Sequence, residues 1–190
     1  AGGNTTTARR WEAVFRALGH ALTSPDDADL LVALHARKSA AAIAAFGGPV
    51  VVAATGTDLY QDLATSTEAM ASFSRAWRIV VLHPLAVDVL PVAVRGRARV
   101  IRQSVVPVAD RPAKDPPYTV AVIGHLRAVK DPLSVAEAAA MLPPRSRIRV
   151  VQVGAALEAG YDEAARGEEA RNPRYRWLGG VPRSDALRVL

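Results

Sequence analysis

The stretch that decides the fold is "TVAVIGHLRAVKDP", residues 119–132. Its first residues are apolar or β-branched and stop at Gly124, which is typical of a strand buried in a parallel sheet. Two cations, Arg127 and Lys130, follow the glycine before an Asp-Pro pair and a helical pattern. Cations that lie where a parallel strand ends and a helix begins predict a binding site for an anion.

Short apolar runs alternate with helical patterns along the whole chain. Strands are expected at residues 30–35, 49–54, 78–83, 98–103, 119–124, 148–154 and 174–179. Helices are expected at residues 5–18, 36–46, 65–76, 84–90, 132–142, 155–171 and 184–190. Alternating strands and helices predict an α/β fold with parallel sheets built from βαβ units.

A segment with four prolines, residues 105–117, interrupts this alternation and is interpreted as a linker. It divides the chain into an N-terminal domain, 1–104, and a C-terminal domain, 118–190, each Rossmann-like. The second domain has three expected strands and stops in a helix, so we expect it to be incomplete. The chain is therefore interpreted as part of a longer protein.

Composition excludes several classes of function. Cysteine is absent, which excludes disulfides and thiolate metal sites and fits a reducing, cytoplasmic location. The net charge is +6, but each domain carries eleven basic and eight acidic residues, so no basic patch predicts nucleic-acid binding. No apolar run approaches the roughly 20 residues of a membrane helix. The oligomeric state is unknown from the sequence.

Polar residues gather where the expected strands end. His35, His83 and His125 each lie where a strand ends. An ordinary loop histidine is the favoured interpretation of each one alone, but three at the same edge weaken it. Their spacing is not that of a zinc site, so no metal is expected. Asp58, in "TGTDLY" (55–60), is interpreted either as a turn or helix-capping residue or as a general base.

The opening "AGGNTTTARRW" is interpreted as a glycine loop that runs into a helix. Glycines there would let the backbone approach an anion, and the N–H groups of the helix would face it. The threonines provide a second interpretation, as caps of the same helix. The loop matches neither of the glycine-rich phosphate motifs.

Six blocks together resemble the bacterial selenosugar synthases of selenoneine biosynthesis, which are GT-B glycosyltransferases close to family four. The blocks are "GGNTTTARRW" (2–11), "DLLVALHARKSAAAI" (29–43), "VVAATGTDLYQDL" (51–63), "VIGHLRAVKDP" (122–132), "RIRVVQVGAAL" (147–157) and "NPRYRWLGGVPRSDALRVL" (172–190). The resemblance implies two Rossmann-like domains whose parallel sheets face each other across a cleft. It implies transfer of a sugar from a UDP-sugar, with UDP-N-acetylglucosamine expected, to selenophosphate, without a metal or another cofactor.

The resemblance, for the donor side, and the positions of polar residues at strand ends and in the opening loop, for the acceptor side, predict roles for particular residues. Catalytic roles are expected for His35, Asp58, Arg127 and Lys130. The donor is expected to contact Gly124, His125, Arg127, Lys130, Gly154, Leu178, Val181 and Pro182. The acceptor is expected to contact Gly3, Asn4, His35, Arg37, Thr55, Gly56, Thr57, Asp58 and His83.

Two alternatives stay open at this point. A GT-B transferase with a hydroxyl acceptor would need a base, for which Asp58 or a histidine could serve. A two-domain protein could instead close on an anionic ligand without catalysis. A nicotinamide-dependent dehydrogenase is disfavoured because neither domain has the dinucleotide-binding fingerprint.

Overall fold

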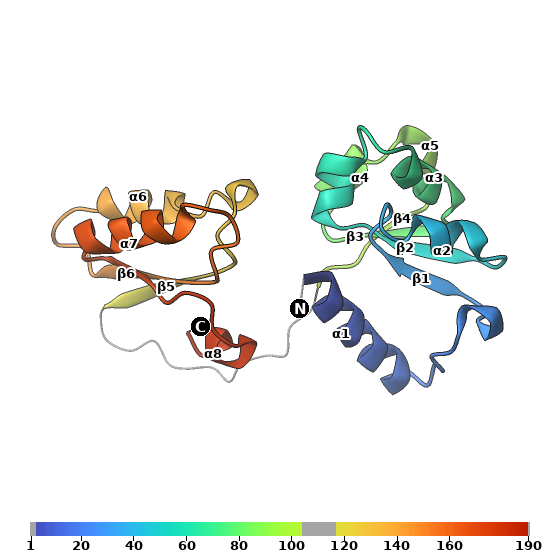
Figure 1. Cartoon of the computed structure of the whole chain (residues 1–190), viewed down its shortest axis with the longest axis horizontal. Coiled ribbons are helices and arrows are strands. Elements are labelled where there is room, and N and C mark those ends of the chain that lie inside the picture. Colours follow the sequence, from blue (N-terminus) through green and yellow to red (C-terminus); the bar gives the residue numbers. More distant parts are fainter. Residues whose placement is uncertain (1–2, 104–116, 190) are drawn as a thin grey trace. The chain divides into compact units, whose positions relative to one another are not determined.

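The computed structural model describes residues 3–103 and 117–189 of the 190-residue chain. The chain divides into two compact units, Ala1–Val105 and Val106–Leu190, and each is described by itself (Figure 1). Except for residue 117, the expected linker lies outside the described residues.

Unit 1 contains a parallel sheet of four strands in the order β1-β2-β3-β4. The strands are β1 (Leu31–Leu34), β2 (Val50–Ala53), β3 (Arg78–Val81) and β4 (Ala98–Val100). The helices are α1 (Gly3–Ala17), α2 (Ala40–Ala45), α3 (Thr67–Arg75), α4 (Leu85–Val89) and α5 (Val92–Arg95), with a 3₁₀ turn at Pro25–Asp27 and a π-helical turn at Asp58–Asp62. Each strand is joined to the next through a helical connection, as βαβ units require.

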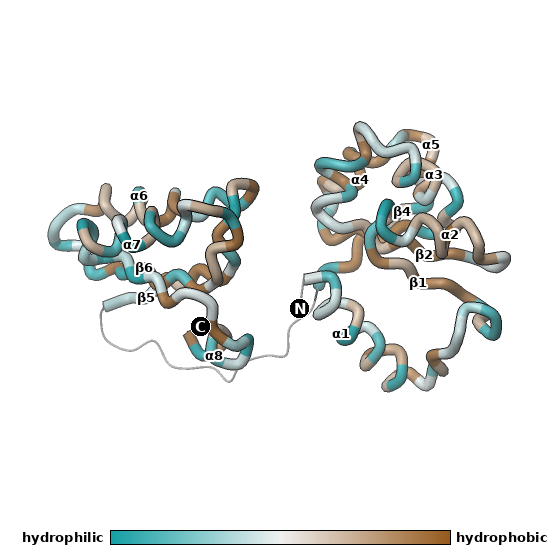
Figure 2. The backbone as a smooth tube through the Cα atoms, in the orientation of Figure 1, coloured by the Kyte–Doolittle hydropathy of each residue, from teal (hydrophilic) through white to brown (hydrophobic). Residues whose placement is uncertain are grey.

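The core of unit 1 lies between one face of this sheet and helices α2 to α5 (Figure 1). Val50 and Val52 of β2 alternate toward the helices, as do Ile79 and Val81 of β3, and all four are fully buried. Phe73 of α3 fills the space above them and is also fully buried. Figure 2 shows the resulting concentration of hydrophobic residues along the strands. Packing of small aliphatic side chains against Phe73 and Phe46 therefore forms this core.

Unit 2 contains a parallel sheet of three strands in the order β5-β6-β7. The strands are β5 (Tyr118–Ile123), β6 (Ile148–Val153) and β7 (Tyr175–Trp177), and the helices are α6 (Ser134–Ala140), α7 (Tyr161–Arg171) and α8 (Arg183–Leu187), with a 3₁₀ turn at Ala128–Lys130. α6 and α7 cover one face of the sheet (Figure 1). Tyr175 in the core donates a hydrogen bond to Gln152 Oε1 at 2.5 Å. Burial, followed by the charges of Glu169 and Glu168, raises the pKa of Tyr175 to about 12.

These two sheets confirm the α/β prediction, but several expected helices have different starts. The helix expected at 36–46 begins at Ala40, and the helix expected at 155–171 begins at Tyr161. In both cases, residues after a strand form a loop that contacts a neighbouring strand end. Backbone hydrogen bonds from His35 to Ala53 and from Leu126 to Ala155 hold these loops. Such long-range contacts override the local helical pattern.

The expected glycine loop at the N-terminus is wrong for Gly3 and Asn4. Both lie in the first turn of α1, which runs without interruption to Ala17. The helix includes the threonines, so the second interpretation, in which they cap it, is wrong as well. Gln103 donates to Thr7 Oγ1 at 3.3 Å, so this end of α1 lies near the residues that follow β4.

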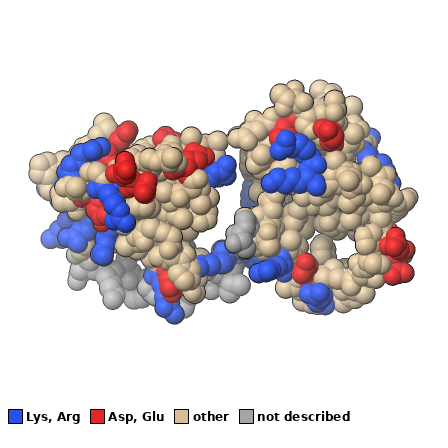
Figure 3. Space-filling model, viewed as in Figure 1, with Lys and Arg blue, Asp and Glu red and all other residues tan. Residues whose placement is uncertain are grey.

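Charged side chains of both signs are interspersed on the face of each unit shown in Figure 3. Within residues 3–103 and 117–189, no helix combines the length and apolar character needed to cross a bilayer.

Candidate functional site

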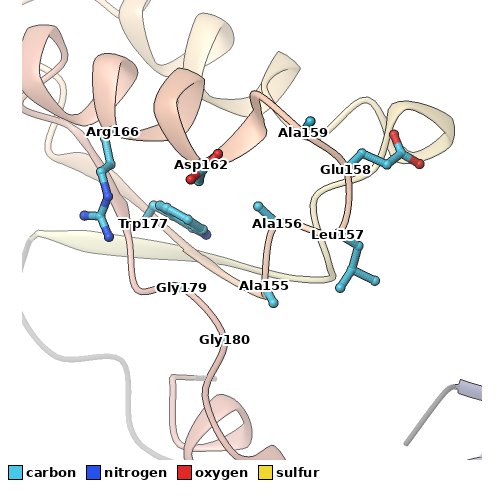
Figure 4. A pocket seen from close by; sticks show the side chains of 10 residues that line it. All are labelled: Ala155, Ala156, Leu157, Glu158, Ala159, Asp162, Arg166, Trp177, Gly179 and Gly180. Atoms are coloured by element: carbon cyan, nitrogen blue, oxygen red, sulfur yellow. The ribbon is translucent and has the colours of Figure 1, made fainter.

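A pocket of about 540 Å³ opens at the carboxyl ends of β6 and β7 in unit 2 (Figure 4). Three segments form it: the loop after β6, the first turns of α7, and the residues at the end of β7. Its lining consists of Ala155, Ala156, Leu157, Glu158, Ala159, Asp162, Arg166, Trp177, Gly179 and Gly180. The carboxyl edge of an open parallel sheet is where α/β proteins bind ligands.

Glycines allow the strand ends around this pocket to approach closely. Gly154 has φ +151°, and a Cβ there would lie 2.0 Å from the carbonyl oxygen of Gly124. The Gly154 N–H donates to the carbonyl oxygen of Gly179 at 2.8 Å, which joins the ends of β6 and β7. At Gly180, a Cβ would lie 3.0 Å from the Cβ of Ala155. Bare backbone at Gly179–Gly180 is therefore left accessible to a ligand.

Trp177 and Arg166 form one end of the pocket. The Trp177 indole donates to the carbonyl oxygen of Gly154 at 2.9 Å, so its ring is fixed in orientation. The Arg166 guanidinium lies 5.2 Å from the centroid of that ring, within cation–π range. Figure 4 shows Glu158 at the opposite end of the lining from Arg166. The pocket thus has a cationic end and an acidic end.

None of the residues expected to contact the donor is among those that line the pocket, but several of them are chain neighbours or contact partners of lining residues. Gly154, Leu178 and Val181 are chain neighbours of lining residues. His125 accepts a hydrogen bond at Nδ1 from the N–H of Ala155 at 3.1 Å. Pro182 precedes α8 as its N-cap. The structure therefore brings the expected residues to one edge, and their roles in donor binding stay predictions.

Arg127 and Lys130 lie in the loop after β5, and Arg127 contacts the acidic end of the pocket. Glu158 Oε1 lies 3.5 Å from Arg127 Nε, and Glu158 Oε2 accepts a hydrogen bond from the N–H of Ala128 at 2.7 Å. Both members of the ion pair are partly exposed, Arg127 by 45% and Glu158 by 40%. Lys130 is exposed to solvent. Arg127 therefore already has an anionic partner from its own chain.

Sequence reasoning missed the pocket residues Glu158, Asp162, Arg166 and Trp177. It placed residues 155–171 in one helix, which concealed the loop. A signal was present: Gly160 precedes Asp162 and Glu163, and a glycine followed by acidic residues is typical of a helix start. Gly160 has φ +83° and is the N-cap of α7.

In unit 1, Asp58 joins the ends of β1 and β2. Its carboxylate is fully buried and accepts from the N–H of Ala36 at 2.7 Å, the N–H of Thr55 at 2.5 Å and the Thr55 hydroxyl at 2.7 Å. The bond to Thr55 three residues earlier is the backward half of a capping box. Both carboxylate oxygens thus serve the backbone, which favours the structural interpretation of Asp58 over a general base.

His35 and Asp62 lie beside this carboxylate. His35 is buried and has a left-handed backbone, with φ 75°. Its Nδ1 lies 3.5 Å from the N–H of Lys38, a long hydrogen bond, and 3.9 Å from Asp58 Oδ2. Nε2 lies 3.7 Å from Asp62 Oδ2, and neither atom has a hydrogen-bond partner among the described residues. Asp62 Oδ2 also lies 3.1 Å from Arg37 Nε.

Burial lowers the pKa of His35 below its usual value of 6.5. The carboxylates of Asp58 and Asp62 raise the pKa, and the nearby charges of Lys38 and Arg37 lower it. Because desolvation is the largest of these effects, the ring is neutral at neutral pH. Arg37, although half exposed, shares its charge with Asp62 and is therefore a weaker anion site than its position in the sequence suggested.

The remaining residues expected on the acceptor side lie at the ends of β2 and β3. Gly56 and Thr57 begin the helical turn that contains Asp58. His83 is exposed and lies 3.0 Å from the hydroxyl of Tyr60, which the sequence did not single out. π-helical turns such as Asp58–Asp62 are rare and often occur at functional sites.

The expected acceptor residues do not form a single cluster. Gly3 and Asn4 lie in α1, and within residues 3–103 no hydrogen bond or ion pair joins them to His35 or Asp58. In the part of the chain that the structure describes, no three His, Asp or Glu side chains gather in a way that could hold a metal ion.

No protein-family model matches the chain, and no curated protein matches it. Solved structures match its fold. HepE from Anabaena in complex with UDP-glucose is 18% identical with a TM-score of 0.57, over 84% of this chain and 50% of that chain. HepE in complex with UDP and glucose is also 18% identical, with a TM-score of 0.59, over 98% of this chain and 55% of that chain. The apo form of the lipopolysaccharide outer core galactosyltransferase WaaB is 14% identical, with a TM-score of 0.54, over 85% of this chain and 46% of that chain.

The chain therefore spans about half the length of the structures that it matches. At these identities the likeness establishes the fold. It confirms the prediction of a GT-B fold built from Rossmann-like units with parallel sheets. The predicted cleft between the two domains stays a prediction.

The structural role of Asp58 predicts the effect of Asp58→Asn. An amide presents one N–H₂ group to backbone donors that need an acceptor, so the variant should lose about 2–4 kcal/mol of unfolding free energy. Urea unfolding, combined with hydrogen exchange of β1 and β2 amides, measures this. The exposed Asp29→Asn should change stability by less than about 0.5 kcal/mol. A variant as stable as the parent would contradict the structural role.

The buried neutral His35 predicts a pH dependence of stability. Because folding lowers its pKa from 6.5, the unfolded chain binds more protons as the pH falls below that value. The unfolding free energy of unit 1 should be at its full value above pH 6.5 and fall on acidification toward the folded pKa. His35→Asn, which tolerates the left-handed backbone, should flatten this dependence. The unfolding free energy is compared between the parent and His35→Asn from pH 7 to about pH 5, the range in which an ordinary histidine titrates. Equal slopes against pH in the two proteins would exclude the effect.

Proposed function

We propose that this chain belongs to a glycosyltransferase that joins the sugar of a UDP-sugar, with UDP-N-acetylglucosamine expected, to selenophosphate. One observation supports the donor side of the proposal: the pocket at the carboxyl ends of β6 and β7, with Arg127 paired to its lining residue Glu158, in a GT-B fold. A structure with this fold, HepE, was crystallised with UDP-glucose. The volume of about 540 Å³ is typical of small-molecule sites.

The donor side suits a nucleotide diphosphate. The bare backbone at Gly179–Gly180 offers amide and carbonyl groups to a planar base at close range. Arg127 and Lys130 can neutralise a diphosphate, the guanidinium by paired hydrogen bonds and the ammonium as a point charge. Such cations stabilise the negative charge that develops on UDP as it leaves, so the chemistry needs no metal.

The proposed reaction balances as follows. The selenium of selenophosphate attacks the anomeric carbon of the donor sugar, the bond from that carbon to UDP breaks, and UDP leaves with the electron pair. Water then cleaves the phosphorus–selenium bond, which gives a 1-selenosugar and phosphate. Because the selenium nucleophile is already anionic, no general base is required. The buried, fully bonded state of Asp58 is compatible with this requirement.

A second candidate is a GT-B transferase with a hydroxyl acceptor. The pairing of Arg37 with Asp62 favours it, because this carboxylate reduces the positive potential that an anionic acceptor needs. Neutral His35 beside Asp62 also resembles a base with a carboxylate partner, although both are buried.

The donor site predicts weaker UDP binding when its cations are removed. Arg127→Ala and Lys130→Ala should each lose about 1.5–3 kcal/mol, roughly 10- to 150-fold in Kd, because each removes a charge-assisted contact to the diphosphate. Isothermal titration of UDP measures this. Arg145→Ala, an exposed arginine of the same unit outside this edge, is the matched control. Unchanged Kd in both variants would move the diphosphate elsewhere.

Product analysis tests the reaction. The protein is incubated with UDP-N-acetylglucosamine and either selenophosphate or hydroxyl acceptors, and products are identified by mass. We expect UDP and a selenosugar, with turnover that survives EDTA. Transfer to a hydroxyl acceptor alone would favour the second candidate. UDP binding without turnover of any acceptor would favour the non-catalytic anion-binding alternative.

A further inference from the structure

The side chain of Glu158 connects two loops at the edge of unit 2. It comes from the loop after β6, and its carboxylate reaches the loop after β5. There Oε2 accepts from the N–H of Ala128 at 2.7 Å, while Oε1 lies 3.5 Å from Arg127 Nε. Figure 4 shows Glu158 beside the yellow turn of the β5 loop. One carboxylate thus interacts with two neighbouring hydrogen-bond donors, the Ala128 N–H and the Arg127 guanidinium.

The Ala128 N–H and the Arg127 guanidinium are groups of the kind that bind a phosphate oxygen. A backbone N–H and a guanidinium bind anionic oxygens in the same way whether the oxygens belong to a carboxylate or to a phosphate. The ion pair is 40–45% exposed, so a dissolved anion can reach it. Glu158 also lines the pocket proposed for the donor. An anion entering from the pocket therefore meets Arg127 and Ala128 with Glu158 already bound to them.

The two loops do not depend on Glu158 for their contact. Leu126 donates its N–H to Ala155 at 3.0 Å, and Leu157 donates its N–H to Leu126 at 3.1 Å. The Leu126 side chain is fully buried in the core of unit 2. A half-exposed ion pair adds little to such a scaffold. Glu158 can therefore turn away from Arg127 while the backbone around it stays in place.

We propose that Glu158 is an internal competitor for the anion site of unit 2, which a diphosphate must displace from Arg127 and the Ala128 N–H. This inference rests on the proposed donor site and adds a residue, Glu158, that makes the site selective for multiply charged anions. A ligand with several negative charges binds Arg127 and the Ala128 N–H strongly enough to displace Glu158, whereas a weakly charged anion does not. Removing the carboxylate charge should therefore strengthen the binding of diphosphates.

The test compares Glu158→Gln with the parent chain by isothermal titration of UDP and, separately, of inorganic pyrophosphate. Glutamine keeps the length of the side chain and an oxygen for the Ala128 N–H, but it carries no charge. We expect the Kd of both ligands to fall about three- to tenfold, because a like charge has left the site. The effect should shrink at high salt. Glu163→Gln removes the same charge from the exposed surface of α7 and should change Kd less than twofold.

A third variant separates competition from positioning. Glu158→Ala removes both the charge and the hydrogen bond, and competition predicts tighter binding in this variant also. Weaker binding of both ligands in Glu158→Gln and Glu158→Ala would overturn the proposal and make Glu158 a positioning residue for Arg127. Tighter pyrophosphate binding without any binding of UDP would support the competitor and refute the proposed nucleotide donor. Unchanged Kd for both ligands would refute the competitor alone.

Discussion

The edge of unit 1 depends on the buried carboxylate of Asp58. Where parallel strands end, their backbone N–H groups lose the partners of the ladder and need new acceptors. Asp58 supplies these acceptors to Ala36 after β1 and to Thr55 after β2. Between these two segments, His35 has a left-handed conformation and Asp62 lies beside its ring. Asp58, which the sequence suggested as a catalytic residue, thus has a structural role: it holds the backbone segments that carry the other polar residues.

Unit 2 joins its strand ends mainly through glycine backbone, to which His125 and Trp177 add side-chain hydrogen bonds with Ala155 and Gly154. Gly154 approaches Gly124 so closely that no side chain fits between them, and its N–H pairs with Gly179. This difference has a functional consequence. Side chains fill the edge of unit 1, where the polar cluster is largely buried, whereas the edge of unit 2 leaves space for a pocket. The second edge therefore suits a ligand of nucleotide size.

Sequence reasoning predicts the strands and their parallel arrangement because β-branched runs, such as residues 49–54, carry a local signal. It fails where distant segments decide the backbone. Residues 36–39 have a helical sequence, but the N–H of Ala36 bonds to Asp58 and its carbonyl oxygen accepts from Ser72, so they form a turn. The pairing of Arg37 with Asp62 joins residues 25 positions apart, and no local pattern encodes it. Candidate cations were therefore found from the sequence, but their partners were not.

Those partners decide what the two edges can bind. Arg37 pairs with Asp62 and Arg127 with Glu158, so at either arginine an anionic ligand has to exchange with a carboxylate. The two carboxylates differ in burial: the side chain of Asp62 is 10% exposed and that of Glu158 is 40% exposed. Glu158 can turn into solvent and regain hydration, whereas Asp62 has little access to water that would compensate for losing Arg37. Exchange is therefore easier at Arg127, which is consistent with the proposal that the donor diphosphate binds in unit 2. An acceptor at the edge of unit 1 would be held mainly by groups that do not require Asp62 to move, such as exposed His83 and Tyr60.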